Sequence, residues 1–163
     1  MEIKILKDEG CPEWVIKHSI AVYKKAIEIS ENFDDVDLDL IKKGALLHDL
    51  GRSKTNKIEH GVIGSKIAKE HGFPPEVCSI IEKHIGAGIS EDESEKIGLP
   101  KKSYIPITLE EKIVAHSDNL FNGSDEVNIE FTIKKWKGKI DNYEESVVKL
   151  RKLNYELIEQ FKK

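Results

Sequence analysis

Apolar residues recur at helical spacing along almost the whole chain, and no run alternates apolar and polar residues as a half-buried strand would. This spacing predicts helices over about residues 12–33, 38–50, 59–71 and 75–84, a fifth that begins after Thr108, and a helical tail from about residue 128 that breaks near Gly138. The pattern therefore predicts an all-α bundle of about six helices.

Residues with clear boundary preferences support several of these limits. Pro12 and Pro75 suit the first turn of a helix, and Gly51 suits a helix end. Thr108 and Glu111 have the spacing of a capping box, which explains Glu111 without a catalytic role. The polar segment 87–106 is long for a loop in a compact domain, and we expect it to act as a lid that sets specificity.

Composition narrows the class of protein. The chain has 163 residues, enough for one domain, and 39% of them are hydrophobic. Its formal charge of −4 argues against nucleic acid as a partner, although a local basic patch remains open. No apolar run approaches the roughly 18 residues of a membrane span, and the first residues do not resemble a signal peptide. We expect a cytoplasmic protein with no membrane partner.

Histidines and aspartates fall on apolar stripes of several predicted helices. His48 and Asp49 follow the apolar run Ala45-Leu46-Leu47, and an ionised aspartate at the end of a buried segment is costly unless it is paired or metal-bound. Taken singly, each such residue has an ordinary structural explanation as a hydrogen-bonded core side chain or a helix-end histidine. Taken together, they favour a metal centre formed by His18, His48, Asp49, His60, His84 and Asp118.

This ordered set resembles the HD-domain superfamily of metal-dependent phosphohydrolases. HDLGR is similar to the family signature HDIGK, and HGVIGSKIAKEHGFP is similar to the HPxxGAEIL region of its two-metal members. HIGAGI and TLEEKIVAHSDNL resemble segments of small stand-alone members of the family. The resemblance implies one HD domain over residues 1–163, with its core at about 14–122.

The resemblance also implies roles for the candidate residues. One metal would be held by His18, His48, Asp49 and Asp118, and a second by His60 and His84 with Asp49 bridging. Imidazole and carboxylate ligands suit Mn, Fe, Co, Ni or Zn, and Mg fits them less well. A metal-activated water would cleave a phosphomonoester or phosphodiester of a nucleotide or another small metabolite. Arg52, Lys54 and Asn119 would contact the substrate.

The sequence departs from the family in two places. Ile85 follows His84, where many two-metal relatives have a second histidine, and the GYP motif of the cyclic-di-GMP-cleaving branch is absent. A di-iron oxygenase with the same ligands and a non-catalytic nucleotide sensor therefore remain alternatives. His71 lies about 16 Å along its helix from His60, and His116 faces away from Asp118, so neither is expected in the site.

The C-terminal region, residues 128–161, carries apolar residues at alternating spacings of four and three. They are Trp136, Ile140, Tyr143, Val147, Leu150, Leu157 and Phe161, with the polar Asn154 in the same series. Such a series resembles a coiled-coil seam, which would form a homodimer interface. Packing against its own domain is the favoured interpretation.

Overall fold

The computed structural model covers residues 1–163 and confirms the all-α prediction, with nine α-helices rather than about six. The helices are α1 (Glu2–Asp8), α2 (Glu13–Ser30), α3 (Leu38–Leu47), α4 (His60–Glu70), α5 (Pro75–Glu82), α6 (Glu91–Lys96), α7 (Leu109–Asn119), α8 (Ile129–Trp136) and α9 (Tyr143–Leu157). Two 3₁₀ turns, η1 (Leu50–Ser53) and η2 (Glu159–Phe161), and a hairpin of β1 (Phe121–Asn122) and β2 (Asp125–Glu126) complete the fold.

Helix boundaries follow the side chains that cap them. The Asp37 side chain accepts a hydrogen bond from the Leu40 backbone N–H at the start of α3. Thr108 and Glu111 form the predicted capping box at the start of α7. Asn128 caps α8, accepting from the Phe131 N–H. These caps fix where the helices that border the site begin.

Two predictions about local structure were wrong. The segment 87–106 is not a plain loop, because Ser90 caps the short helix α6 within it. His84 is not in a helix, because α5 ends at Glu82 and the chain turns through Gly86 and Gly88, both with positive φ. The short helix α1 and the hairpin, which have little periodicity to detect, were not predicted.

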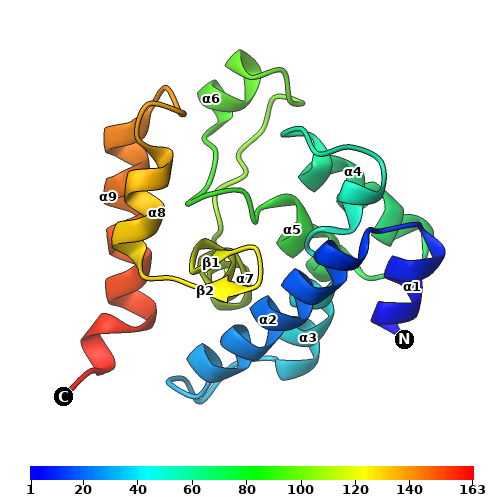
Figure 1. Ribbon diagram of the computed structural model, residues 1–163, viewed down its shortest axis with the longest axis horizontal. Coiled ribbons are helices and arrows are strands. Elements are labelled where there is room, and N and C mark those ends of the chain that lie inside the picture. The colour runs from blue at the N-terminus through cyan, green and yellow to red at the C-terminus, as the bar shows by residue number, and fades with distance from the viewer.

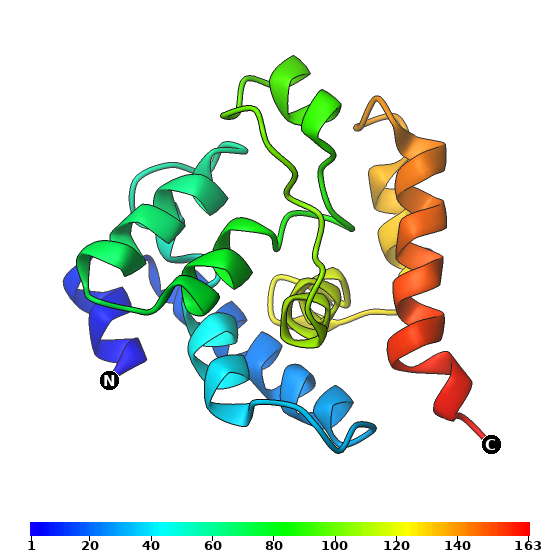
Figure 2. The same ribbon diagram turned by 180° about the vertical axis from the view of Figure 1, so that it is seen from behind.

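The helices form two groups joined by the hairpin segment. Helices α1 to α5 and α7 pack together, while α8 and α9 lie along each other on the opposite side (Figure 1). The view from behind shows the same separation and places α6 away from the other helices (Figure 2). One core cluster lies among α2, α3, α5, α7, α8 and α9, and a second lies among α1, α4, η1 and the adjoining ends of α2, α3 and α5.

Part of the C-terminal series, for which packing against its own domain was favoured over a dimer seam, lies inside this domain. Leu150 and Leu157 are fully buried in the first core cluster, and Leu153 of the same helix lies there too. Asn154 accepts a hydrogen bond at 2.9 Å from Nε2 of the buried His116. Asn154, the polar member of the series, is therefore hydrogen-bonded to a residue of its own chain. None of the nine helices combines the length and the apolar character needed to cross a bilayer.

Candidate metal centre

Five helices and the turns that follow two of them bring the six predicted residues into one cluster. His18 comes from the middle of α2, His48 and Asp49 from the end of α3, His60 from the start of α4, His84 from the turn after α5, and Asp118 from the end of α7. All six side chains are largely buried, and Asp118 is the most open of them at 23% exposed. The structure thus brings the whole predicted set together.

A close backbone contact places His60 beside Asp49. A Cβ built on Gly51 would lie 1.8 Å from the His60 carbonyl oxygen and 2.7 Å from the Gly64 nitrogen. Only glycine lets the η1 turn approach the start of α4 this closely. Because Gly51 follows Asp49 by two residues, the contact brings His60 Nε2 to 3.4 Å from Asp49 Oδ1.

One group of ligands surrounds Asp118. Its Oδ1 atom lies 2.8 Å from His18 Nε2 and 3.4 Å from His48 Nε2, and the two imidazole nitrogens are 3.3 Å apart. Asp49 Oδ2 lies 3.5 Å from both nitrogens. Four donor atoms from three helices and the turn after α3 therefore face one point.

The second group uses the other oxygen of the same aspartate. Asp49 Oδ1 lies 3.3 Å from His84 Nε2 and 3.4 Å from His60 Nε2, and these two nitrogens are 3.1 Å apart. The Asp49 carboxylate thus lies between the two histidine pairs and offers one oxygen to each.

The hydrogen bonds of the histidines show which ring nitrogen is free to bind a cation. Each Nδ1 lies 2.6–2.8 Å from a backbone carbonyl oxygen, which can only accept, so each Nδ1 carries the proton. The four carbonyls belong to Gly123, Ala45, Lys57 and Ile81. In the neutral tautomer every Nε2 then presents its lone pair to the cluster, as metal-ligating histidines do.

The spacing of the donor atoms fits a first-row divalent metal. Nitrogen and oxygen ligands at about 2.0–2.2 Å from one ion lie about 2.8–3.6 Å from one another in octahedral or tetrahedral geometry. The separations within both groups, 2.8–3.5 Å, match that range. Converging lone pairs and carboxylates at this distance repel one another unless positive charge lies among them, so the residues fit a divalent metal site.

The electrostatics of the cluster favour positive charge. Burial lowers the pKa of His48, but the charges of Asp49 and Asp118 outweigh it and raise the pKa to about 9. Burial raises the pKa of Asp49, but His48 and the hydrogen bonds from His60 and His84 hold it well below its usual value. Both carboxylates are therefore ionised at neutral pH and available as ligands.

A cavity of about 250 Å³ opens onto the first group of ligands. His18, Asp49, Asp118, Arg52 and Asn119 line it. The Arg52 Nε lies 3.1 Å from Asp49 Oδ2, and the Asn119 Nδ2 has no hydrogen-bond partner in the protein. Two of the three predicted substrate-contacting residues, Arg52 and Asn119, thus border the cavity beside the metal ligand Asp49.

Lys54, the third predicted substrate contact, is not brought to the cavity. Its ammonium lies 3.9 Å from a Glu9 carboxylate oxygen, and more than half of its side chain is exposed. The η1 turn ends at Ser53, which directs Lys54 toward α1 instead of toward Asp49. His71 also contacts Glu9, at 2.8 Å, and His116 contacts Asn154, so both lie outside the cluster as expected.

The cavity lining also includes residues that were not predicted in the site, among them Trp14, Thr132, Lys135 and Trp136. Three of them belong to α8, whose position beside the site depends on the turn through the hairpin. The helical spacing of Trp136 marked it as a packing residue, and no local signal connected α8 with His18 or Asp118.

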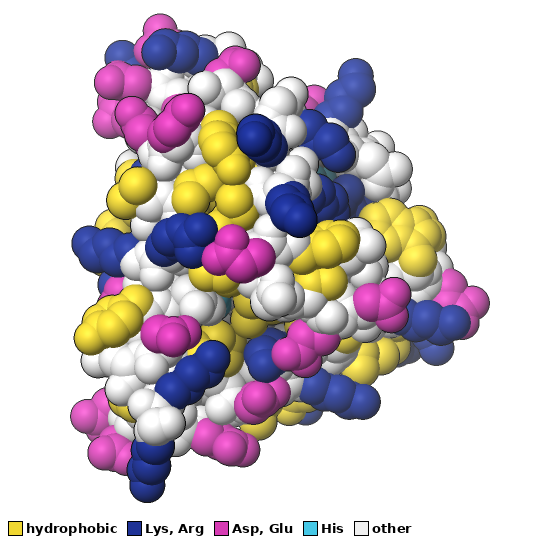
Figure 3. Space-filling view, turned by 60° about the vertical axis from the view of Figure 1, so that its left-hand side comes forward, with side chains coloured by type: hydrophobic (Ala, Val, Ile, Leu, Met, Phe, Trp, Pro, Cys, Tyr) yellow, Lys and Arg dark blue, Asp and Glu magenta, His cyan; other side chains and the backbone are white.

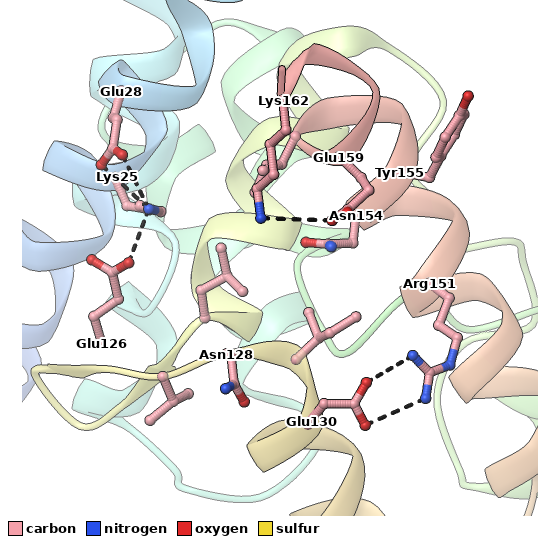
Figure 4. Close-up of a pocket in the computed structure, with 14 residues that line it drawn as sticks. Lys25, Glu28, Glu126, Asn128, Glu130, Arg151, Asn154, Tyr155, Glu159 and Lys162 are labelled. Atoms are coloured by element: carbon pink, nitrogen blue, oxygen red, sulfur yellow. Dashed lines mark hydrogen bonds and ion pairs between the residues drawn. The ribbon is translucent and has the colours of Figure 1, made fainter.

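A larger cavity of about 870 Å³ lies between α2, the hairpin and α9 (Figure 4), and none of the six cluster residues lines it. The charged groups that line it pair with one another: Lys25 lies 2.9 Å from Glu126, and Arg151 lies 2.8 Å from Glu130. It contains no histidine and no group of carboxylates without cations. Its size therefore does not make it the candidate site.

Comparison with known proteins agrees with this geometry. The HD domain family model matches residues 15–123. The chain is 45% identical over 159 residues to an uncharacterized protein of Methanocaldococcus jannaschii, covering 95% of this chain and 94% of that protein. It is 40% identical over 155 residues to a tRNA (cytidine(56)-2'-O)-methyltransferase of Picrophilus torridus, covering 95% of this chain but only 45% of that protein.

A solved structure has the same fold. The HD domain of the L. monocytogenes phosphodiesterase PgpH, solved in complex with cyclic-di-AMP, aligns with a TM-score of 0.58 and 18% sequence identity. The alignment covers 99% of this chain and 97% of that one. At this identity the match establishes the shared arrangement of helices.

Proposed function

The chain belongs to the HD domain family, and we propose that it is a metal-dependent phosphohydrolase acting on a phosphomonoester or phosphodiester of a nucleotide or another small metabolite. The observation that carries the proposal is the convergence of four histidine Nε2 atoms on the Asp49 and Asp118 carboxylates beside an open cavity. The PgpH phosphodiesterase, which has the same fold and whose HD domain was solved in complex with cyclic-di-AMP, supports a substrate of this kind.

The proposed ligand set has two parts. His18, His48, Asp49 and Asp118 would hold one divalent ion, and His60 and His84 would hold a second with Asp49 shared between them. Bound there, divalent ions would neutralise charge on phosphoryl oxygens and lower the pKa of a nearby water toward about 7. Mn, Fe, Co, Ni and Zn all suit imidazole and carboxylate ligands.

The chain's own residues would orient these ligands and the substrate. The carbonyls of Gly123, Ala45, Lys57 and Ile81 fix the imidazole rings through Nδ1, which keeps each Nε2 lone pair directed at the cluster. This preorganisation means that little rearrangement is required during the reaction.

Arg52 is the residue best placed to bind a phosphate at this site. Its Nε contacts Asp49 and its guanidinium lies 5.6 Å from the centre of the Trp14 ring, while neither Nη atom has a hydrogen bond or an ion pair. The two Nη groups can donate to two oxygens of one phosphate. Asn119, whose amide has no partner, would donate a further hydrogen bond to the substrate.

Metal analysis combined with a phosphate-release screen tests the proposal. The protein would be stripped with chelator, reloaded separately with Mn, Fe, Co, Ni, Zn and Mg, and assayed against phosphomonoesters and phosphodiesters under air and under strict anaerobiosis. We expect turnover with at least one transition metal that is unchanged without oxygen. Oxygen consumption by the iron-loaded protein without phosphate release would instead favour the oxygenase alternative.

A further inference from the structure

We propose that α8, which follows the part of the chain matched by the family model, completes the substrate site and selects phosphate esters that carry a planar ring. Trp136 would stack on the ring and Lys135 would contact the phosphate, opposite the metal cluster. The inference rests on the proposed function for its catalytic meaning. The binding it describes can be measured without turnover.

The first support is the composition of the cavity wall. Lys135 and Trp136 line the same cavity as His18, Asp49 and Asp118, together with Thr132 of the same helix. The Thr132 hydroxyl donates a 2.6 Å hydrogen bond to the Asn119 carbonyl, which ties α8 to the end of α7 next to Asp118. Helix α8 therefore has a fixed position relative to the metal ligands.

The second support is the charge of the cavity wall. Arg52 and Lys135 line the cavity together with the carboxylates of Asp49 and Asp118. Lys135 makes no ion pair, and its only hydrogen bond is a 3.4 Å contact with the Asn122 side chain. It is exposed, and three further exposed lysines, Lys134, Lys137 and Lys139, belong to the same stretch of chain. Figure 3 shows that Lys and Arg side chains gather on one part of the molecular surface, although the chain as a whole carries a charge of −4.

The third support is the placement of the tryptophans. The chain contains two, Trp14 and Trp136, and both line this cavity. The cation of Arg52 lies over the Trp14 ring, so Trp14 already serves to hold Arg52. Trp136 has no cation over its ring. Its Cζ2 atom would lie 3.9 Å from a Cβ built on Gly86, and apart from the chain neighbours of Gly86 no other atom lies within 4 Å of that position. A ring at this rim can be contacted by substrate.

The volume of the cavity explains why the ring would lie at the rim. About 250 Å³ is below the roughly 300–1,000 Å³ of pockets that enclose a drug-sized ligand. A phosphate and a sugar-sized group fit inside, and an attached base would have to extend past the rim. Stacking of a base on an aromatic side chain is tolerant of base identity, because every base has a π face.

Intrinsic fluorescence provides the test, since both tryptophans report on this cavity and none lies elsewhere. The metal-loaded protein would be titrated with the non-hydrolysable phosphonate analogue of adenosine 5′-monophosphate and with that of ribose 5-phosphate. The two ligands differ only in the base. We expect the adenosine analogue to quench the fluorescence and to bind at least about fivefold more tightly.

Variants of α8 separate ring binding from phosphate binding. Trp136→Leu should remove the preference for the adenosine analogue and leave the affinity for the ribose analogue unchanged, whereas Trp136→Phe, which keeps an aromatic ring, should retain most of the preference. Lys135→Ala should weaken both ligands by the same factor. Lys134→Ala, on the same helix but outside the cavity lining, is the matched control and should weaken neither.

The inference is overturned if the two analogues bind equally well, or if Trp136→Leu weakens both to the same extent while thermal unfolding shows the variant to be folded. Failure of the proposed function would look different. In that case the analogues would bind with the expected preference, and the metal-loaded protein would release no phosphate from any ester.

Discussion

The backbone of Gly51 is in direct contact with the carbonyl of His60: a Cβ at position 51 would lie 1.8 Å from that oxygen. This contact connects the turn after Asp49 with the start of α4 and sets the 3.4 Å separation between Asp49 Oδ1 and His60 Nε2. The absence of a side chain at Gly51 thus allows His60, at the start of α4, to reach the shared aspartate.

We expect Gly51→Ala to displace α4 and to lower metal occupancy of the group that contains His60 and His84. The measurement is metal content per chain after desalting, together with thermal unfolding. Gly61→Ala in the first turn of α4 is the control, because its Cβ would meet no atom closer than 3.4 Å. Equal metal content in the two variants would show that the close contact is not required.

Substitutions of the ligands should separate the two groups by stoichiometry. Asp49→Ala removes oxygens from both groups, so we expect loss of both metals and of turnover. His60→Ala removes a ligand from one group only and should leave one metal bound. His71→Ala, which breaks only the contact with Glu9, should change neither quantity. If two metals remain bound in His60→Ala, the assignment of the second group is incorrect.

The sequence was sufficient for the residues whose placement is governed by local periodicity. His18 and Asp118 lie on apolar stripes of helices that the pattern located, and the Thr108 and Glu111 cap fixed the start of α7. His84 was expected inside a helix, yet it lies in the following turn, where the positive φ of Gly86 is compatible with several chain directions. The occurrence of these residues together on apolar stripes favoured a shared metal centre, and the family resemblance divided them into two groups of ligands.

Contacts between distant segments could not be predicted in the same way. Lys54 was expected near the phosphate. It follows Arg52 by two residues, and the η1 turn points its side chain toward Glu9 instead. Lys135 and Trp136 reach the cavity because the hairpin turns α8 back toward α7, and that direction depends on tertiary packing such as the Thr132 hydrogen bond. Spacing along a helix contains no information about such a turn.

The C-terminal helix should behave as part of the domain core. Leu150 is fully buried in the first core cluster, so we expect Leu150→Ala to lower the free energy of unfolding by about 2–5 kcal/mol. Val148, two residues earlier, is 68% exposed, and Val148→Ala should change the free energy of unfolding by no more than about 0.5 kcal/mol. Chemical denaturation measures both. A large effect of Val148→Ala with a change in sedimentation would instead indicate that α9 forms an interface between copies of the chain.

The Glu111 carboxylate should make the fold sensitive to acid without affecting the metal centre. Burial raises its pKa, but hydrogen bonds from the Ser79 hydroxyl and from the backbone N–H groups of Ile107 and Thr108, with the charge of Lys83, outweigh burial and hold the pKa below its usual value. A pKa lowered by folding stabilises the protein above the unfolded-state pKa. That stabilisation is lost as pH falls through the folded-state pKa.

Glu111→Gln tests this role, because it keeps the shape of the side chain and removes the charge. Near pH 7 we expect the variant to be less stable by about 1.5–3 kcal/mol, the usual contribution of hydrogen bonds to a charged group. The difference from the wild type should shrink as the pH falls from the unfolded-state pKa through the lower folded-state pKa, since the wild-type carboxylate is then protonated first in the unfolded chain and afterwards in the folded one. Metal content should stay the same. A variant that unfolds like the wild type at neutral pH but loses turnover would show that Glu111 acts in the reaction and not as a helix cap.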